Sequence, residues 1–329
     1  MARLRFLLVM LVLAACTRGA GAQTVRSASL AFDNDGFTFW VPPRQRTDWF
    51  YTHGTHLALT FAARPPVARL LGLQDEPLCE PGDGAASMTS ACVTTRLRLA
   101  QEIYTPESLF VYSPTQGDRP YAGWLSVLVE AHRVAPDRSR AVGLELGVTG
   151  PPSGAGQAHL AIHRWLNKAE PGGWDYQIPF ELAGALSVRE TRYWPSIPSA
   201  TRGSASVATS WGASLGTSRT AGLIGFGGRF GWNAPAGMES RGPGAPGGWV
   251  VAHVGTEAEF VAHDLFIDGS LWHDTVEARR EPLVGRLRVS LRAGWDHVGL
   301  HLSVTSSSRA FARQSGAHTY GTLGLLVFP

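Results

Sequence analysis

Hydrophobic and polar residues alternate along most of this chain, so that every second side chain in a run is apolar. The clearest runs place on one face Leu57, Leu59 and Phe61, then Leu125, Val127 and Val129, then Leu323, Leu325 and Val327. Such alternation predicts β-strands with one apolar face, separated here by clusters of Gly, Pro, Asp and Ser. We predict about twelve strands, near residues 25–33, 50–62, 94–105, 119–134, 140–149, 177–190, 202–217, 220–232, 248–263, 284–296, 298–308 and 318–328.

An even number of amphipathic strands suits a closed antiparallel barrel, in which no strand edge is left unpaired. The predicted fold class is therefore all-β: a transmembrane antiparallel β-barrel of about twelve strands, with a short helix in an extracellular loop. A soluble secreted β-sandwich or β-propeller would show the same alternation. Alternation alone does not separate these folds.

One segment interrupts the strand pattern. Residues 158–168 combine Leu, Ala, Arg and Lys without an internal Gly or Pro, which favours a helix. Gly150-Pro151-Pro152 precedes this segment, and Pro171-Gly172-Gly173 follows it. A helix here places His159 and His163 one turn apart on the same face.

The first 22 residues have the organisation of a secretion signal. Arg3 and Arg5 form a basic start, Phe6–Ala15 is apolar, and Ala20-Gly21-Ala22 fits a small-x-small cleavage site. The apolar stretch is shorter than the roughly 20 residues that a membrane-spanning helix needs. We predict residues 1–22 as a signal peptide and residues 23–329 as a single outer-membrane barrel domain. The alternative is a lipoprotein in which Cys16 carries the lipid.

Removing this signal changes the charge balance. The chain has 29 Lys and Arg against 26 Asp and Glu, and the signal holds three arginines but no acid, which leaves 26 of each. The mature chain is thus neutral and gives no support to nucleic-acid binding. Cys79 and Cys92 remain as an even pair in an exported protein, where a disulfide can form. A closed barrel of this kind is expected to be a monomer.

Strand counting brings polar residues from distant parts of the chain to one rim. With the N-terminus in the periplasm, Asn34 and Asp35 end the first strand at the outer rim, and Thr52 begins the second there. The segment 117–121 and the helix with His163 fall on the same rim. The loop that contains both remaining cysteines falls on the periplasmic side.

Several motifs match a known family and occur in its order over most of the mature chain, to about residue 180. They are Phe32-Asp33-Asn34-Asp35, Tyr51-Thr52-His53-Gly54, Gln101-Glu102-Ile103-Tyr104-Thr105-Pro106, Asp118-Arg119-Pro120-Tyr121-Ala122-Gly123-Trp124-Leu125 and Gly147-Val148-Thr149-Gly150-Pro151, followed by His163-Arg164. On these residues the chain resembles the outer-membrane lipid A 3′-O-deacylase family (LpxR-like). The later strands are generic.

This resemblance implies an enzyme that hydrolyses an ester-linked acyl group of lipid A, the membrane anchor of lipopolysaccharide, in the outer leaflet. It also implies that His163 activates water and that Ca²⁺ stabilises the oxyanion. Asp35 and Asn34 would then hold the metal, with Thr52 as a neighbouring polar partner. The chemistry agrees, since calcium prefers oxygen ligands and histidine titrates near neutral pH.

Each of these residues also has a structural interpretation. Asn34-Asp35-Gly36 is typical of a simple turn, and Thr52 of a strand start. His163 could pack within its loop, and Asp118-Arg119 could be a structural ion pair. The joint placement on one rim favours the catalytic interpretation.

The chain departs from the family at one position, because a functional lysine in the loop before the fourth strand is replaced by Ser113-Pro114-Thr115-Gln116-Gly117. The only lysine is Lys168, in the loop that contains His163. Either Lys168 or an arginine such as Arg119 substitutes for the family lysine, or the substrate contact is lost. Arg164 is a further candidate for binding lipid A phosphates, as are the rim arginines Arg44, Arg46 and Arg279. The alternative functions are a non-catalytic barrel, as a channel or surface-binding protein, and a hydrolase of phospholipids.

Overall fold

The computed structural model describes residues 25–38, 49–64, 68–69, 71–79, 91–110, 115–135, 137–194, 197–198, 203–233 and 247–328. The signal peptide prediction, the lipoprotein alternative at Cys16, Arg44, Arg46 and the first part of the replaced lysine loop lie outside these residues.

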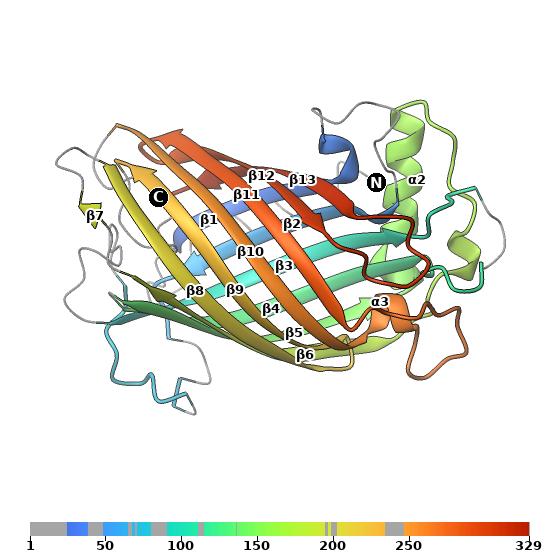
Figure 1. Ribbon diagram of the computed structural model, residues 1–329, viewed down its shortest axis with the longest axis horizontal. Coiled ribbons are helices and arrows are strands. Elements are labelled where there is room, and N and C mark those ends of the chain that lie inside the picture. The colour runs from blue at the N-terminus through green and yellow to red at the C-terminus, as the bar shows by residue number, and fades with distance from the viewer. Residues whose placement is uncertain are drawn as a thin grey trace.

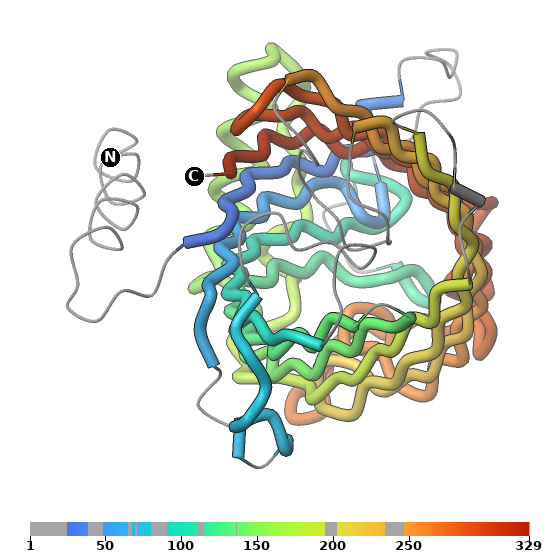
Figure 2. The backbone as a smooth tube through the Cα atoms, turned by 90° about the vertical axis from the view of Figure 1, so that its left-hand side faces the viewer, coloured from blue at the N-terminus to red at the C-terminus, as the bar shows by residue number. Residues whose placement is uncertain are grey.

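The described residues form one antiparallel sheet that closes on itself (Figures 1 and 2). Of its 13 strands, β7 (Ile197–Pro198) is a two-residue extension beside β8, and the other twelve form the barrel. These are β1 (Val25–Asn34), β2 (Phe50–Phe61), β3 (Cys92–Thr105), β4 (Ala122–Val134), β5 (Arg138–Thr149), β6 (Leu182–Tyr193), β8 (Gly203–Gly216), β9 (Arg219–Trp232), β10 (Gly248–Asp264), β11 (Leu283–Trp295), β12 (Val298–Ser307) and β13 (His318–Val327). Pairing of β1 with β13 and of β6 with β8 closes the ring. The predicted twelve-stranded barrel is confirmed.

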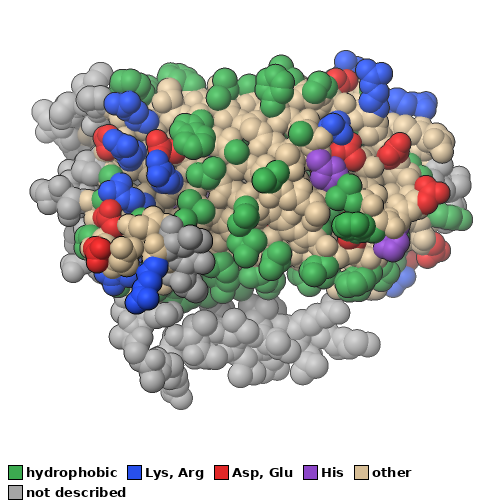
Figure 3. Space-filling model, turned by 90° about the horizontal axis from the view of Figure 1, so that it is seen from below, with side chains coloured by type: hydrophobic (Ala, Val, Ile, Leu, Met, Phe, Trp, Pro, Cys, Tyr) green, Lys and Arg blue, Asp and Glu red, His purple; other side chains and the backbone are tan. Residues whose placement is uncertain are grey.

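The apolar face of the strands points outward. Many of its side chains are well exposed on the outer wall, among them Leu99, Val127, Leu146, Ile224 and Leu300. Figure 3 shows one face of the barrel, with hydrophobic side chains spread over its middle and charged side chains gathered toward its two ends. An outward apolar band between two polar ends is the surface that a bilayer requires. None of the helices in the described ranges is long and apolar enough to cross a membrane.

The strand starts differ most from the sequence prediction before β6, which begins at Leu182 rather than near residue 177. Ahead of it, Trp174–Tyr176 form a 3₁₀ turn (η4), and Ile178 packs into a fully buried apolar cluster. The residues just before β6 therefore pack against other segments and do not pair in the sheet. Their alternation of apolar and polar side chains did not predict this packing.

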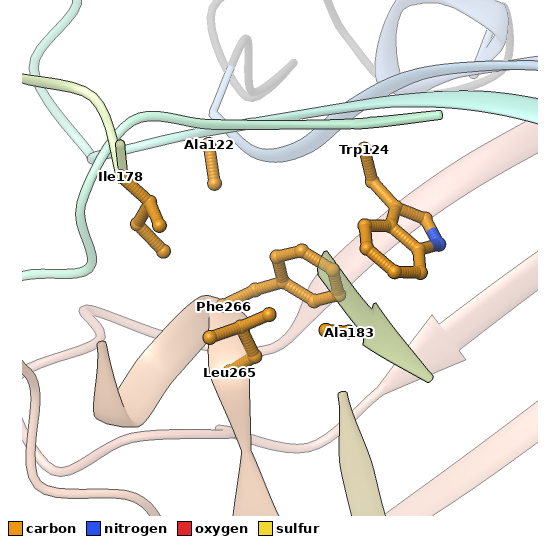
Figure 4. Close-up of a cluster of buried hydrophobic side chains, with 6 residues drawn as sticks. All are labelled: Ala122, Trp124, Ile178, Ala183, Leu265 and Phe266. Carbon is orange, nitrogen blue, oxygen red and sulfur yellow. The ribbon is translucent and has the colours of Figure 1, made fainter. Parts of the chain in front are cut away.

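A short helix, α3 (Leu265–Asp268), packs inside one mouth of the barrel. Its residues Leu265 and Phe266 join Trp124 in an apolar cluster with Ala122, Ile178 and Ala183 (Figure 4). The ring of Phe266 stacks on Tyr104, with centroids 4.4 Å apart. Large apolar side chains thus narrow the barrel at this end.

The opposite end carries the cysteine loop. Cys79 and Cys92 form a disulfide, and Leu78 pairs with Val93 beside it. Val93 is fully buried there among Ala68, Leu73 and Ala131. The disulfide therefore lies at the end of the barrel away from α3, as strand counting predicted.

Candidate active site on the outer wall

The helix predicted around residues 158–168 is α2 (Ala155–Trp165), and it packs on the outer face of the barrel (Figure 1). Ile103 shares the outward face of β3 with the exposed Leu99, yet Ile103 is fully buried because Ala155 and the α2 loop cover it. Gln101, on the same outward face, donates from Nε2 to the carbonyl of Ser153 at 2.7 Å. The site next to α2 therefore faces the lipid side of the wall and not the lumen.

A glycine on β4 allows this close approach. A Cβ atom at Gly123 would collide with Ser153 Oγ and Ala155 Cβ. The N-cap of the helix is Gly154, whose left-handed backbone (φ 69°) favours glycine. Glycines at these two positions therefore allow α2 to lie close against the wall.

Replacing Gly123 with valine should push α2 off the wall. We expect faster amide hydrogen exchange in residues 155–165, with the strands still protected, because the collision involves only the helix side of β4. The matched control is Gly285→Val on β11, where a Cβ would meet nothing within 4 Å. Equal exchange in α2 for both variants would contradict this docking.

The two histidines of α2 turn toward the wall and are almost completely buried, with exposures of 2% for His159 and 4% for His163. Their rings are perpendicular, with centroids 4.6 Å apart. His163 Nδ1 lies 2.6 Å from the carbonyl oxygen of Ala169. Because a carbonyl can only accept, Nδ1 carries the proton, and Nε2 of neutral His163 keeps its lone pair.

His159 is held in the other tautomer. Trp174 Nε1–H donates to His159 Nδ1 at 3.2 Å, so the proton of His159 sits on Nε2. Burial first, and then the charges of His163 and His53, lower the pKa of His159 to about 3. His159 is therefore neutral at physiological pH. Trp174 was not predicted as a site residue. It follows a Pro-Gly-Gly turn, and nothing in the local sequence indicated its hydrogen bond to His159.

The end of β1 and the start of β2 supply the polar residues predicted from the first hairpin. Asn34 accepts from the backbone N–H of Gly36 at 2.8 Å and donates to the carbonyl of Thr52 at 2.8 Å. It thereby caps the 3₁₀ turn η1 (Asp35–Phe37), in which Asp35 is only 2% exposed. The hydroxyl of Thr52 lies 2.7 Å from that of Thr105. Asn34 therefore stabilises a turn, as its structural interpretation predicted, and this is compatible with a role in binding a metal ion.

This polar hairpin end lies at the same end of the barrel as α2 (Figure 1). His53, next to Thr52, pairs in register with Asn34 and interacts electrostatically with His159 of α2. The fold therefore brings this hairpin end and the α2 histidines to the same end of the barrel.

The residues at this hairpin end suit a hard cation in chemical type. Asp35 supplies a carboxylate, and Asn34 and Thr52 supply neutral oxygens. Calcium takes about six to eight oxygen ligands, whereas the described residues contain no group of three or more His, Cys, Asp or Glu side chains that could hold a metal. A calcium ion here would thus need backbone carbonyls and water in addition to Asp35.

The residues predicted to bind the phosphates of lipid A do not all lie on the lipid-facing side of the wall. Arg119 is buried in the barrel mouth, where it donates to the carbonyl of Phe266 at 3.1 Å and stacks over Tyr104. Burial lowers its pKa. The expectation that Arg119 binds substrate beside His163 does not fit this position, because α2 lies on the other face of the wall. Asp118 accepts from the backbone N–H of Glu107 and Arg119, and this fixes the loop.

Lys168 and Arg164 do lie with His163. The backbone N–H of Lys168 donates to the carbonyl of His163 at 2.9 Å, and its side chain is exposed. Arg164 forms an exposed two-bond ion pair with Glu170, at 2.7 and 2.9 Å. This pair raises the pKa of Arg164 and lowers that of Glu170. Of the two candidates Lys168 and Arg119, Lys168 is therefore the one that lies beside His163.

Comparison with known proteins agrees with this architecture. The family model of the outer membrane protein LpxR matches residues 5–328. No curated protein sequence matches the chain. Among solved structures, LpxR from Salmonella typhimurium superposes with a TM-score of 0.74 at 18% identity, covering 92% of this chain and 100% of that one. The β-domain of the Bordetella autotransporter BrkA gives a TM-score of 0.42 at 11% identity, covering 92% and 98%. The chain belongs to the LpxR family of outer membrane proteins.

Proposed function

We propose that this protein is a carboxylic-ester hydrolase that removes the 3′-acyloxyacyl group from lipid A in the outer leaflet. Membership of the LpxR family supports this activity. The main structural support for this proposal is the burial of His163 against the lipid-facing wall. Its Nδ1–H donates a hydrogen bond to the carbonyl of Ala169. A lipid substrate could reach such a site without leaving the bilayer.

In this proposal His163 is the general base. Its Nε2 accepts a proton from the water that attacks the ester carbonyl. The Nδ1–H bond to Ala169 fixes the ring and favours the imidazolium that forms. The proton then passes to the departing alkoxide of the sugar. His159, which stays neutral, adds no competing charge beside this step.

Asp35 would hold Ca²⁺, assisted by Asn34 and Thr52. The bound ion would supply positive charge for the oxygen of the ester carbonyl. Asn34 ties the turn that carries Asp35 to β2, which fixes the carboxylate relative to the wall. Lys168, and Arg164 once released from Glu170, would meet the phosphates of lipid A. We expect the protein to act as a monomer.

Mass spectrometry of lipids from cells with and without the protein tests this function. We expect lipid A that has lost one acyloxyacyl group and unchanged phospholipids. Deacylated phospholipids would instead show a phospholipid hydrolase. Unchanged lipids both in cells and in a detergent assay with calcium would contradict the enzyme and favour a non-catalytic barrel.

A further inference from the structure

A second polar surface lies inside the barrel, on β11. The outward residues Leu287, Val289 and Leu291 have exposures of 45%, 50% and 43%. The alternate residues Arg286, Arg288, Ser290 and Arg292 therefore point inward, and all four line a lumen cavity of about 780 Å³. Arginines thus follow the inner side of one strand.

The neighbouring strand β12 continues this surface. In register, Arg288 pairs with Thr305, Ser290 with Ser303, and Arg292 with His301. All six residues line the cavity, and we call them the donor patch. Guanidinium, hydroxyl and imidazole groups can all donate hydrogen bonds, and the patch contains no carboxylate.

Most carboxylates of the lumen are engaged by other arginines. Glu259 pairs with Arg219 at 2.8 Å and with Arg286 at 2.6 Å. Arg189 forms an ion pair with Glu257. Across the lumen, Arg98 pairs with Glu145 at 3.0 Å. These carboxylates therefore have their ion-pair partners outside the donor patch.

Arg288 is different from these paired arginines. Its side chain contacts Thr305 Oγ1 at 3.2 Å, and within the described ranges no carboxylate lies within ion-pair distance of it. Glu257 interacts with it electrostatically but forms its ion pair with Arg189. Arg288 is exposed to the cavity. Its charge is available to a ligand in the lumen.

We propose that the donor patch binds a small multivalent oxyanion of the phosphate class inside the barrel. Arg288 and Arg292 are four residues apart, about 13 Å along the strand, so their long side chains can reach a ligand held over Ser290 and Ser303. Guanidinium groups suit phosphate because they can form two parallel hydrogen bonds with it. The apolar wall strengthens the attraction, because it focuses the field within the lumen.

This anion site is independent of the proposed hydrolase site. The donor patch lies on the inner face of β11 and β12, whereas α2 covers the outer face of β3 and β4. No residue of the patch belongs to the acyl site, so its variants should leave ester hydrolysis unchanged.

Calorimetric titration of the folded, detergent-solubilised mature chain with inorganic pyrophosphate tests the proposal. At constant ionic strength in chloride, we expect saturable binding of one anion per barrel. In Arg288→Gln, affinity should fall by about tenfold or more, because one charge-assisted contact is lost. Arg288→Lys should restore part of it, since the charge returns without the bidentate geometry.

Arg138→Gln is the control. It removes an exposed arginine that pairs with Asp137 at the start of β5, outside the cavity lining. It should bind pyrophosphate like the unmodified chain, and heat-modifiable migration should confirm that every variant is folded. The absence of saturable binding, or equal affinity in Arg288→Gln and Arg138→Gln, would overturn the proposal.

Discussion

Replacing His163 with alanine is expected to lower acyl release from lipid A by about 10²- to 10⁴-fold, the usual contribution of a general base. The barrel should still fold, because His163 belongs to a helix outside the sheet and its side-chain hydrogen bond to the carbonyl of Ala169 is local to that loop. The measurement is initial-rate release of the acyl group in detergent with calcium, beside heat-modifiable migration on gels.

Gln157→Ala is the matched control for this variant, because Gln157 is exposed on the same helix. It should keep near-normal activity. Retention of activity in His163→Ala would remove His163 from the mechanism, and equal losses in both variants would point to disruption of the helix.

The pH profile tests whether His159 takes part in the reaction. Burial is the main cause that lowers the pKa of His159 to about 3, so His159 is neutral at all pH values well above that. A fall in rate on acidification between about pH 7 and 5 would therefore come from a group other than His159. His159→Gln should keep this acidic limb. Loss of the limb in His159→Gln would assign the titration to His159.

Replacing Asp35 with asparagine is expected to produce the second large effect, a loss of about 10²- to 10³-fold in rate at saturating calcium. The substitution keeps the shape of the side chain but removes its charge, which a calcium ion requires. Calcium binding measured by calorimetry should weaken in parallel, and EDTA should inhibit the unmodified protein but not lower the residual rate of the variant.

Asp175→Asn provides the control, because Asp175 is an exposed acid in η4 of the α2 loop. It should bind calcium and hydrolyse lipid A like the unmodified chain. If Asp35→Asn retained full calcium affinity, the metal would not be held by this carboxylate. If it lost activity without any calcium binding in the unmodified protein, Asp35 would act in another way.

Much of the fold could be predicted because strand alternation is a local property. The twelve barrel strands follow from period-two runs, and the outward Leu287, Val289 and Leu291 already imply inward arginines on the same strand. The predicted helix between β5 and β6 is present, displaced a few residues toward the N-terminus. The start of β6 was not predictable, because Ile178 left the sheet to fill a cluster with residues from α3.

The candidate site could be predicted only in part. Asn34, Asp35 and Thr52 come from motifs at strand ends, and His163 comes from the resemblance of His163-Arg164 to the family motif. Trp174, which sets the tautomer of His159, carries no such signal, since its role depends on the return of the loop onto the helix.

The sequence by itself determined the alternation, the strand number and the end of the barrel at which the polar residues gather, because each follows from chain direction and side-chain period. The tertiary structure alone decided on which side of the wall each residue lies. Gly123 lets α2 dock outside, so His163 faces the lipid side, while Arg119 turns inward to Phe266. That choice depends on close contacts between segments far apart in the chain, which no local pattern records.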